Sequence, residues 1–534
     1  MRRPSAHVAA DTSATVIDTT VGELLGARAS CHPNREALVG VGHDGHAVRL
    51  TYSELYEESR HVAAALSKLT EPGDYVAIWA PNMAEWPLVQ YGAAMAGVVL
   101  VALNPMLSEA ELHYALTHSQ AKVLVYADRV RDRSTADVAQ QVGAHLPQLQ
   151  LVSLSQRTRW RADVVDDSLL RERETRDAGQ AVMLQYTSGT TGRPKGVLLN
   201  HRAIVNVAKL TLEAVDAGHG TRFLNPLPMF HTAGCVISTL GPLWSAGTVV
   251  LVERFSPDPV LDSLARERIE VLFYVPAILS ALVTAQRSRQ SPAPQLRLML
   301  GGASNVSAEL ILSAESCFGG TVVNLFGQTE LAPVLTLTRP RDTRHDRLTT
   351  VGRPLPQVEC KIVDAHGQVA EVDTVGEICA RGYQQFLEYL HDPEATAAAL
   401  DDEGFVRTGD LGMIDERGYL TVTGRLKELI IRGGENVSPA EVEGLLDRDS
   451  RVDQAVVLGL PDERLGEIVA AVIRTQMPGA RLKDELTDLL WSRTSPHKIP
   501  ERWFVADEVP CTTTGKVQRF VLREAILRGE LTEL

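Results

Sequence analysis

The segment YTSGTTGRPKG, residues 186–196, concentrates residue types that bind phosphate. Its glycines let the backbone approach a ligand and present its N–H groups, while the serine and threonine hydroxyls add donors. Lys195 supplies a mobile positive charge suited to a polyphosphate. The segment is not a Walker loop, because Pro194 stands where GxxxxGKS/T counted from Gly189 requires glycine. We therefore interpret the segment as a phosphate-binding loop rather than a linker.

The elements around this loop follow the pattern of an α/β protein. Apolar AVMLQ before the loop and GVLL after it predict one strand arriving and one leaving. Between about residues 20 and 340, helical patterns alternate with short apolar runs, which predicts parallel sheets covered by helices. These runs are DYVAIWA, AKVLVYA, GTVVLVE, VLFYV and LRLMLGG. Residues 345–424 predict a small β-rich subdomain, and the segment after Gly424 predicts an α+β domain.

Composition excludes several classes of protein. The chain has 534 residues, 44% of them hydrophobic and 22% charged, which is typical of a globular protein of more than one domain. A net charge of −14 argues against nucleic acid as a partner. The six cysteines lack metal-ligand spacing, and the longest apolar run, at 91–103, is too short to span a bilayer. We expect a cytoplasmic protein without an integral membrane segment.

Seven further stretches occur in the order found in one enzyme superfamily. They are PLPMFHTAG (226–234), LGGA (300–303), NLFGQTE (324–330), VGRPLP (351–356), RTGDLGMID (407–415), GRLKELIIRGGENVSPAEVE (424–443) and PCTTTGKVQR (510–519). Together with the loop, they resemble the signatures of the adenylate-forming enzymes, and the GGENVSPAEVE stretch is closest to acyl-CoA synthetases. The resemblance covers nearly the whole chain.

The resemblance implies an ATP-dependent, AMP-forming acid–CoA ligase that uses ATP, Mg²⁺ and coenzyme A. It makes an acyl adenylate and then a thioester. The implied catalytic residues are Lys516, Glu330, Lys195 and Thr190, with Glu330 as the Mg²⁺ ligand. Such a site must place positive charge where two anions meet. Phe326 stands where the family usually has tyrosine, so the ring face is kept and the hydroxyl is lost.

The resemblance also assigns binding residues. For ATP or AMP these are Thr187, Ser188, Gly189, Thr190, Thr191, Lys195, Gly302, Ala303, Asn324, Phe326, Gly327, Gln328, Thr329, Asp410 and Arg425. The implied acyl pocket comprises His231, Thr232, Gly234, Cys235, Tyr274, Ile278, Gly301, Gly302 and Gly327. The implied pantetheine channel comprises Gly433, Gly434 and Glu435.

The implied domain organisation is a large N-terminal domain followed by a mobile C-terminal domain. The N-terminal AMP-binding domain covers residues 1–425 and contains two α/β sheet subdomains and the small β-rich one. The C-terminal α+β domain covers residues 426–534, with its hinge near Lys427. Adenylation and thioester formation need different groups in one cleft, and rotation about this hinge would exchange Lys516 for the 432–438 loop.

The acyl group and its acceptor are less defined. The implied lining is apolar or small and has no arginine for a second carboxylate, which favours a fatty, aryl or bulky polycyclic acid. Transfer to a carrier-protein phosphopantetheine is the alternative to free CoA. Amino-acid activation would need an acidic residue where Phe230-His231 stands, and nothing marks light emission. A catalytically inactive nucleotide- or acyl-binding relative is the non-enzyme alternative, and a homodimer is the expected assembly.

Overall fold

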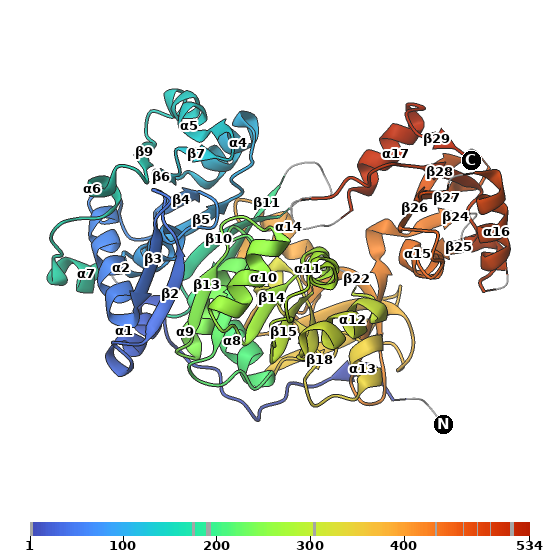
Figure 1. Cartoon of the computed structure of the whole chain (residues 1–534), viewed down its shortest axis with the longest axis horizontal. Coiled ribbons are helices and arrows are strands. Elements are labelled where there is room, and N and C mark those ends of the chain that lie inside the picture. The colour runs from blue at the N-terminus through green and yellow to red at the C-terminus, as the bar shows by residue number, and fades with distance from the viewer. Residues whose placement is uncertain are drawn as a thin grey trace. The chain divides into compact units, whose positions relative to one another are not determined.

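The computed structural model describes residues 4–173, 177–187, 194–302, 306–432, 435–462, 464–477, 479–491, 493–512 and 517–534. It divides into two compact units. The large unit comprises Ala9–Glu359 and Ala380–Val406, and the small unit comprises Met1–Val8, Cys360–Cys379 and Arg407–Leu534. Figure 1 labels many of the elements of both units. The boundary near Lys427 and the mobility of the C-terminal domain stay predictions.

Two mixed sheets form the large unit. The order of the seven-stranded sheet is β21 (Glu388–Tyr389), β11 (Lys195–Asn200), β10 (Ala181–Thr187), β5 (Val99–Leu103), β4 (Tyr75–Trp79), β6 (Val123–Tyr126) and β9 (Gln150–Ser153). The order of the nine-stranded sheet is β18 (Arg353–Pro354), β17 (Thr336–Leu337), β16 (Thr321–Phe326), β15 (Leu298–Gly302), β14 (Val271–Tyr274), β12 (Arg222–Asn225), β13 (Thr248–Leu251), β2 (Glu36–Val41) and β3 (Ala47–Thr51). A separate hairpin joins β7 (Arg129–Val130) and β8 (Arg133–Ser134).

Helices connect the strands of the large unit, as the alternating pattern predicted. They are α1 (Val21–Cys31), α2 (Tyr52–Leu66), α3 (Glu85–Met95), α4 (Glu109–Ser119), α5 (Thr135–Ala144), α6 (Arg157–Trp160), α7 (Asp167–Arg173), α8 (His201–Ala214), α9 (Ser238–Trp244), α10 (Pro257–Arg266), α11 (Pro276–Ser288), α12 (Ala308–Phe318), α13 (Arg344–Thr349) and α14 (Pro393–Ala398). Capping boxes at Thr20, Thr51 and Ser108 fix the starts of α1, α2 and α4, because each side chain satisfies a backbone N–H that the helix leaves unpaired.

The small unit contains β-rich and α+β parts. Its five-stranded sheet has the order β1 (His7–Val8), β19 (Val358–Val363), β20 (Gly376–Gly382), β22 (Val406–Ile414) and β23 (Leu420–Arg425). Its second sheet has the order β25 (Glu435–Val437), β24 (Ile430–Arg432), β27 (Gly466–Arg474), β28 (Arg502–Val505) and β29 (Thr532–Glu533), with β26 (Gln454–Asp462) also paired to β27. Its helices are α15 (Pro439–Leu446), α16 (Ala480–Trp491) and α17 (Arg519–Leu527).

The predicted strands are confirmed, and one detail of the sheets differs from the expectation. The central strands pair in parallel, whereas β10 with β11, β2 with β3 and β16 with β17 are antiparallel. Consecutive strands joined by a short connection can only return antiparallel, while a parallel neighbour needs a helical crossover. The phosphate-binding segment is such a short connection, because Thr187 on β10 pairs with Lys195 on β11.

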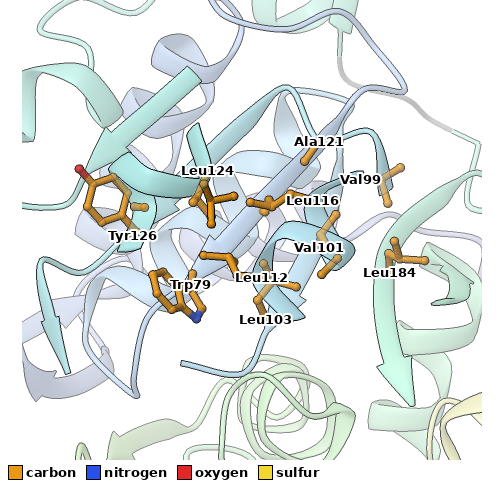
Figure 2. Packing of buried hydrophobic residues seen from close by; sticks show 14 of the residues in the cluster. Trp79, Val99, Val101, Leu103, Leu112, Leu116, Ala121, Leu124, Tyr126 and Leu184 are labelled. Atoms are coloured by element: carbon orange, nitrogen blue, oxygen red, sulfur yellow. The ribbon is translucent and has the colours of Figure 1, made fainter. Parts of the chain in front are cut away.

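The hydrophobic core beneath this hairpin is built from the seven-stranded sheet and α4. All five residues of β5 are buried, as expected for a strand covered on both faces. Leu112 and Leu116 of α4 lie over these strands, with Leu124 and Leu184 in the same cluster (Figure 2). Leu198 of β11 and Leu390, next to β21, belong to this cluster too. The core therefore supports both strands that flank the candidate site.

Within the described ranges, no helix has both the length and the apolar character that crossing a bilayer requires. The expected cytoplasmic location and the homodimer stay predictions.

Replacing Leu124 by alanine tests this core. Leu124 is fully buried, so Leu124→Ala should lower the free energy of unfolding by about 2–5 kcal/mol, through lost burial and the cavity left behind. The matched control is Leu387→Ala, because the Leu387 side chain is exposed and should change stability by roughly 0.5 kcal/mol or less. Urea unfolding followed by circular dichroism measures both, and equal effects would contradict this assignment of the core.

Candidate active site

The strands on either side of the phosphate-binding segment form an antiparallel hairpin. Tyr186 pairs with Gly196, and Thr187 pairs with Lys195 at the end of the hairpin that adjoins the connecting segment. A second contact holds this end, since the Tyr114 hydroxyl of α4 donates to the Pro194 carbonyl oxygen at 3.1 Å. Four predicted phosphate-binding residues lie outside the described residues: Ser188, Gly189, Thr190 and Thr191.

Lys195 and Glu330 both contact Tyr389, Lys195 through the aromatic ring and Glu330 through the hydroxyl. The Lys195 Nζ atom lies 4.5 Å from the centroid of the Tyr389 ring, within the range of a cation–π interaction. The Tyr389 hydroxyl donates to Glu330 Oε1 at 2.7 Å. Glu330 lies in a short 3₁₀ turn, η2 (Thr329–Leu331), whereas Tyr389 is on the edge strand β21. The structure thus brings together two predicted site residues through a third that sequence reasoning missed.

Tyr389 retains its proton in this arrangement. Burial raises the pKa of the phenol above its ordinary value, and the nearby Glu330 charge raises the pKa further. Both effects disfavour a second negative charge next to a carboxylate. Tyr389 therefore acts as a hydrogen-bond donor to Glu330 throughout the physiological pH range.

The carboxyl ends of β14, β15 and β16 lie side by side, and Tyr274, Gly301, Gly302 and Asn324 are buried there. Tyr274 pairs with Gly301, and Gly301 pairs with Asn324, so the predicted segments end at one edge of a parallel sheet. A Cβ atom on Gly301 would collide with the Tyr274 carbonyl oxygen, and one on Gly302 with the Leu325 carbonyl oxygen. Ligands bind at the carboxyl ends of strands in α/β sheets, and glycine at these two positions lets the neighbouring backbone pack closely there.

The chain becomes accessible at the last two residues of β16 and stays so beyond the strand. Asn324 is buried, whereas Leu325 to Glu330 are all partly exposed, and this range includes predicted Phe326, Gln328 and Thr329. Gly327 packs against Pro333, whose carbonyl oxygen leaves no room for a Cβ atom.

The buried Asn324 Oδ1 atom has no hydrogen-bond partner among the described residues. An unpaired buried acceptor is costly, so Asn324 suits a ligand that donates an N–H. Ala303 lies outside the described residues.

His231 is the predicted acyl-pocket residue with a distinctive electrostatic state. Its ring lies 4.4 Å from that of Phe230, and burial lowers the pKa of His231 to about 4. The imidazole is therefore neutral at pH 7. It precedes a π-helical turn, η1 (Ala233–Ile237), in which buried Gly234 packs against Pro228. Single π-helical turns occur frequently at functional sites.

Other predicted acyl-pocket residues belong to the packed interior. The Cys235 thiol is fully buried and accepts a hydrogen bond from Gln185 Nε2 at 3.3 Å. Burial raises the pKa of Cys235, so this thiol is not a nucleophile. The Tyr274 hydroxyl donates to the Val323 carbonyl oxygen at 3.3 Å. Thr232 and Ile278 are also buried. Their place in an acyl pocket stays a prediction.

In the small unit, two residues that were predicted to bind ATP or AMP contact each other. Asp410 on β22 pairs with Arg425 on β23, and Arg425 Nε donates to Asp410 Oδ1 at 2.9 Å. Asp410 is 4% exposed, so the guanidinium stabilises a carboxylate that is mostly shielded from water. The Thr408 hydroxyl accepts the Asp410 N–H at 3.1 Å and thereby fixes the backbone at this point.

The predicted hinge and channel are described only in part. The Lys427 backbone lies in a 3₁₀ turn, η3 (Leu426–Glu428), and Glu435 pairs with Arg432 across β24 and β25. The side chains of Lys427 and Glu435 are outside the described part. Gly433, Gly434 and Lys516 lie outside the described residues altogether.

Arg519 is a second residue that sequence reasoning missed. It starts α17, three positions after Lys516, and donates to Glu428 Oε2 at 2.8 Å and to both carboxylate oxygens of Glu443 at 2.8 Å. Burial raises the pKa of Glu443, and the adjacent guanidinium opposes that shift. Arg519 thus links the start of α17 to the segment next to Lys427. The sequence signal that could have pointed to Arg519 is its position directly after GKVQ, the segment that contains Lys516.

Glu330 fits the expected Mg²⁺ as a carboxylate ligand. No cluster of three or more His, Cys, Asp or Glu side chains that could hold a metal occurs within the described residues. Mg²⁺ in nucleotide sites is commonly held by one or two carboxylates together with substrate phosphates, rather than by a cage of protein ligands. A single oriented carboxylate near Lys195 matches that donor set.

Comparison with known proteins agrees with this geometry. Residues 25–390 match the model for the AMP-binding enzyme family, and residues 441–516 match that for the AMP-binding enzyme C-terminal domain. The medium-chain acyl-CoA ligase ACSF2 of Macaca fascicularis is 31% identical, over 96% of this chain and 88% of its own.

Another relative is the Rhodococcus jostii 3-[(3aS,4S,7aS)-7a-methyl-1,5-dioxo-octahydro-1H-inden-4-yl]propanoyl:CoA ligase. It is 34% identical, over 89% of this chain and 94% of its own.

A solved structure has the same fold. ATP-bound MatB from Rhodopseudomonas palustris superposes with a TM-score of 0.84, at 27% identity, over 95% of this chain and 99% of its own. The expected use of ATP and CoA agrees with this ATP-bound neighbour and with relatives named as CoA ligases. The chain therefore belongs to the AMP-binding enzyme family, and within it to the acyl-CoA synthetases and ligases.

Proposed function

We propose that this chain joins a hydrophobic carboxylic acid to CoA in two steps. In the first, a carboxylate oxygen attacks the α-phosphorus of ATP, forming a new P–O bond and releasing pyrophosphate. In the second, the CoA sulfur attacks the acyl carbon, the acyl–oxygen bond breaks, AMP leaves and the thiol proton passes to solvent or buffer. Adenylation converts a poor leaving group into a good one.

The observation that carries this proposal is the convergence of Lys195 and Glu330 on Tyr389. A phosphate-binding cation and a metal-binding anion belong side by side where Mg²⁺–polyphosphate binds. Mg²⁺ held through Glu330 would reduce the repulsion between the acid and the phosphates. Lys195 places a further positive charge there, next to the hairpin that carries the hydroxyl-rich segment.

The remaining residues have roles that follow from their chemistry. The unpaired Asn324 Oδ1 acceptor suits the exocyclic amine of adenine. Gly302 is assigned to the nucleotide by the resemblance of its segment. Asp410 can accept hydrogen bonds from both ribose hydroxyls. Lys516 is assigned to the reacting carboxylate and α-phosphate, and the 432–438 loop to the pantetheine arm, by the resemblance of their sequences.

Two observations support an apolar acyl group: the predicted pocket lining is uncharged, and the names of two relatives agree with such a group. No predicted lining residue carries a charge at neutral pH, because the pKa of His231 is lowered to about 4. Burying an unpaired charge against such a lining would be costly, which disfavours a dicarboxylate. One relative is named for a bicyclic propanoyl group and another for medium chains, and both are named for CoA. An inactive relative is disfavoured because Lys195 and Glu330 are both present and converge.

A panel of acids tests the reaction and its acyl class. With ATP, Mg²⁺ and CoA, pyrophosphate release should be fastest for medium-chain, aryl or bicyclic propanoic acids. Acyl-CoA should appear in equal amount, as measured by mass spectrometry. Preference for amino acids or dicarboxylates would overturn the assignment of the pocket. Thioester on a phosphopantetheinylated carrier protein, with none on CoA, would favour the carrier alternative.

The proposed role of Lys516 in adenylation can be tested by measuring adenylation and thioester formation separately. Lys516→Ala should slow adenylation by on the order of a hundredfold or more, because a positioned charge at the reacting phosphate is lost. It should spare thioester formation from supplied acyl adenylate. Lys483→Ala is the control, since this lysine donates to the Leu534 carbonyl oxygen at the C-terminus. Equal loss in both half-reactions would refute the alternating use of Lys516.

The neutrality of His231 predicts a charge-specific effect on acid binding. His231→Asp should raise KM for an apolar acid by on the order of tenfold or more while KM for ATP stays unchanged, because a buried carboxylate is costly. His231→Phe should keep the acid KM near the parent value. In the parent enzyme, His231 becomes charged only as pH falls towards about 4, so it should leave the acid KM constant between pH 6 and 8. If His231→Asp raised the KM for ATP and left the KM for the acid unchanged, this placement of His231 would be contradicted.

A further inference from the structure

We propose that Tyr389 is a positioning residue for the nucleotide–metal site, acting on Glu330 through its hydroxyl and on Lys195 through its ring. This inference rests on the proposed function, and it assigns a role to a residue outside the recognised motifs. The supporting observation is that one side chain contacts both charged groups from different faces, with its hydroxyl on Glu330 and its ring under the ammonium.

The position of Tyr389 is fixed by its own backbone and neighbours. It pairs with Val197 of β11, two residues after Lys195, so the hairpin sets the distance between ring and ammonium. The Tyr389 N–H donates to the Thr396 hydroxyl at 2.9 Å. The Phe386 ring lies 4.9 Å from the Tyr389 ring, and the Phe386 N–H donates to the Glu330 carbonyl oxygen at 2.9 Å. Phe386 and Tyr389 therefore hold both the backbone and the carboxylate of Glu330.

The hydroxyl determines how Glu330 presents its carboxylate. A protonated phenol has one hydrogen to donate, and this hydrogen is directed at Oε1. Engaging one oxygen fixes the rotation of the carboxylate about its terminal torsion, which is otherwise broad. The other oxygen is then oriented before a metal arrives. Groups that orient a metal-binding carboxylate affect metal affinity without contacting the metal.

The ring prevents Lys195 and Glu330 from neutralising each other. Opposite charges this close would readily form a direct ion pair, which would have to break before either could bind a nucleotide. No ion pair between them occurs in the part of the chain that the structure describes. Lys195 instead rests on an aromatic face, an interaction weak enough to yield to a phosphate. Tyr389 thus keeps both charges available.

The test separates the hydroxyl from the ring by equilibrium binding, which needs no acid substrate. Tyr389→Phe removes only the hydroxyl. By calorimetry it should weaken binding of ATP with Mg²⁺ by on the order of tenfold and raise the Mg²⁺ concentration for half-saturation, because a hydrogen bond to a charged group is lost. Binding of ATP in EDTA should change by less than about twofold. Tyr389→Leu, which removes the ring as well, should weaken ATP binding in EDTA too.

Tyr52→Phe is the matched control. The Tyr52 hydroxyl is also buried and donates to the Gly247 carbonyl oxygen at 2.7 Å. Neither Tyr52 nor Gly247 is a predicted site residue. This variant should lower thermal stability without altering Mg²⁺ dependence. If Tyr389→Phe behaved in the same way, the positioning role would be overturned.

A double-mutant cycle shows whether Tyr389 acts through Glu330. In a Glu330→Gln background, Tyr389→Phe should cause little further loss of Mg²⁺-dependent binding, whereas an additive loss would overturn the proposed route. Failure of the proposed function looks different: the parent protein would bind Mg²⁺–ATP with the predicted Tyr389 dependence yet release no pyrophosphate with any acid.

Discussion

Antiparallel pairing between Val197 and Tyr389 joins segments almost two hundred residues apart and determines the charge arrangement of the candidate site. It places an aromatic ring beside Lys195 and a phenol beside Glu330. The pairing itself is short, because β21 has only two residues. Its stability comes from the core below, where Leu198 and Leu390 pack into the cluster that contains α4. Hydrophobic burial thus maintains an electrostatic geometry that the two-residue strand could not hold alone.

The candidate site combines rigid backbone with a few polar groups. The carboxyl ends of β14, β15 and β16 are constrained by parallel pairing, and the glycines there are closely surrounded by backbone carbonyl groups. A rigid edge keeps donors and acceptors in place for a charged ligand, so little reorganisation is needed on binding. The buried acceptor of Asn324 illustrates the cost of this design, since it remains unpaired among the described residues until a donor arrives.

Charge is distributed in opposite ways around the two ends of the proposed reaction. In the large unit, the proposed nucleotide end contains Lys195 and Glu330, both in contact with Tyr389. The acyl end is neutral, because burial suppresses protonation of His231. In the proposed reaction, polar contacts would therefore bind the phosphates of the nucleotide, which is the same for every acid. Selection among acids is left to shape and apolar contact, which distinguish similar groups only modestly.

The sequence by itself determined the family, the α/β architecture and the identity of most candidate residues. Local patterns were sufficient for these, because strand periodicity, glycine-rich turns and ordered motifs are each encoded within short segments. The connection between β10 and β11, for example, follows directly from apolar runs on both sides of YTSGTTGRPKG. The roles assigned to Lys516, Thr190 and the pantetheine channel still rest on resemblance, because these residues lie outside the described part of the chain or are described only in part.

Only the tertiary structure decided which residues meet. Nothing local to EYLHDPEAT indicates that Tyr389 contacts Glu330, nor does the sequence after Lys516 indicate that Arg519 binds Glu428 and Glu443. The contact between the Cys235 thiol and Gln185 in the interior was likewise not indicated by the motif that contains Cys235. Long-range pairing and burial produce these contacts, and both depend on how distant segments pack together rather than on the order of residues within any one of them.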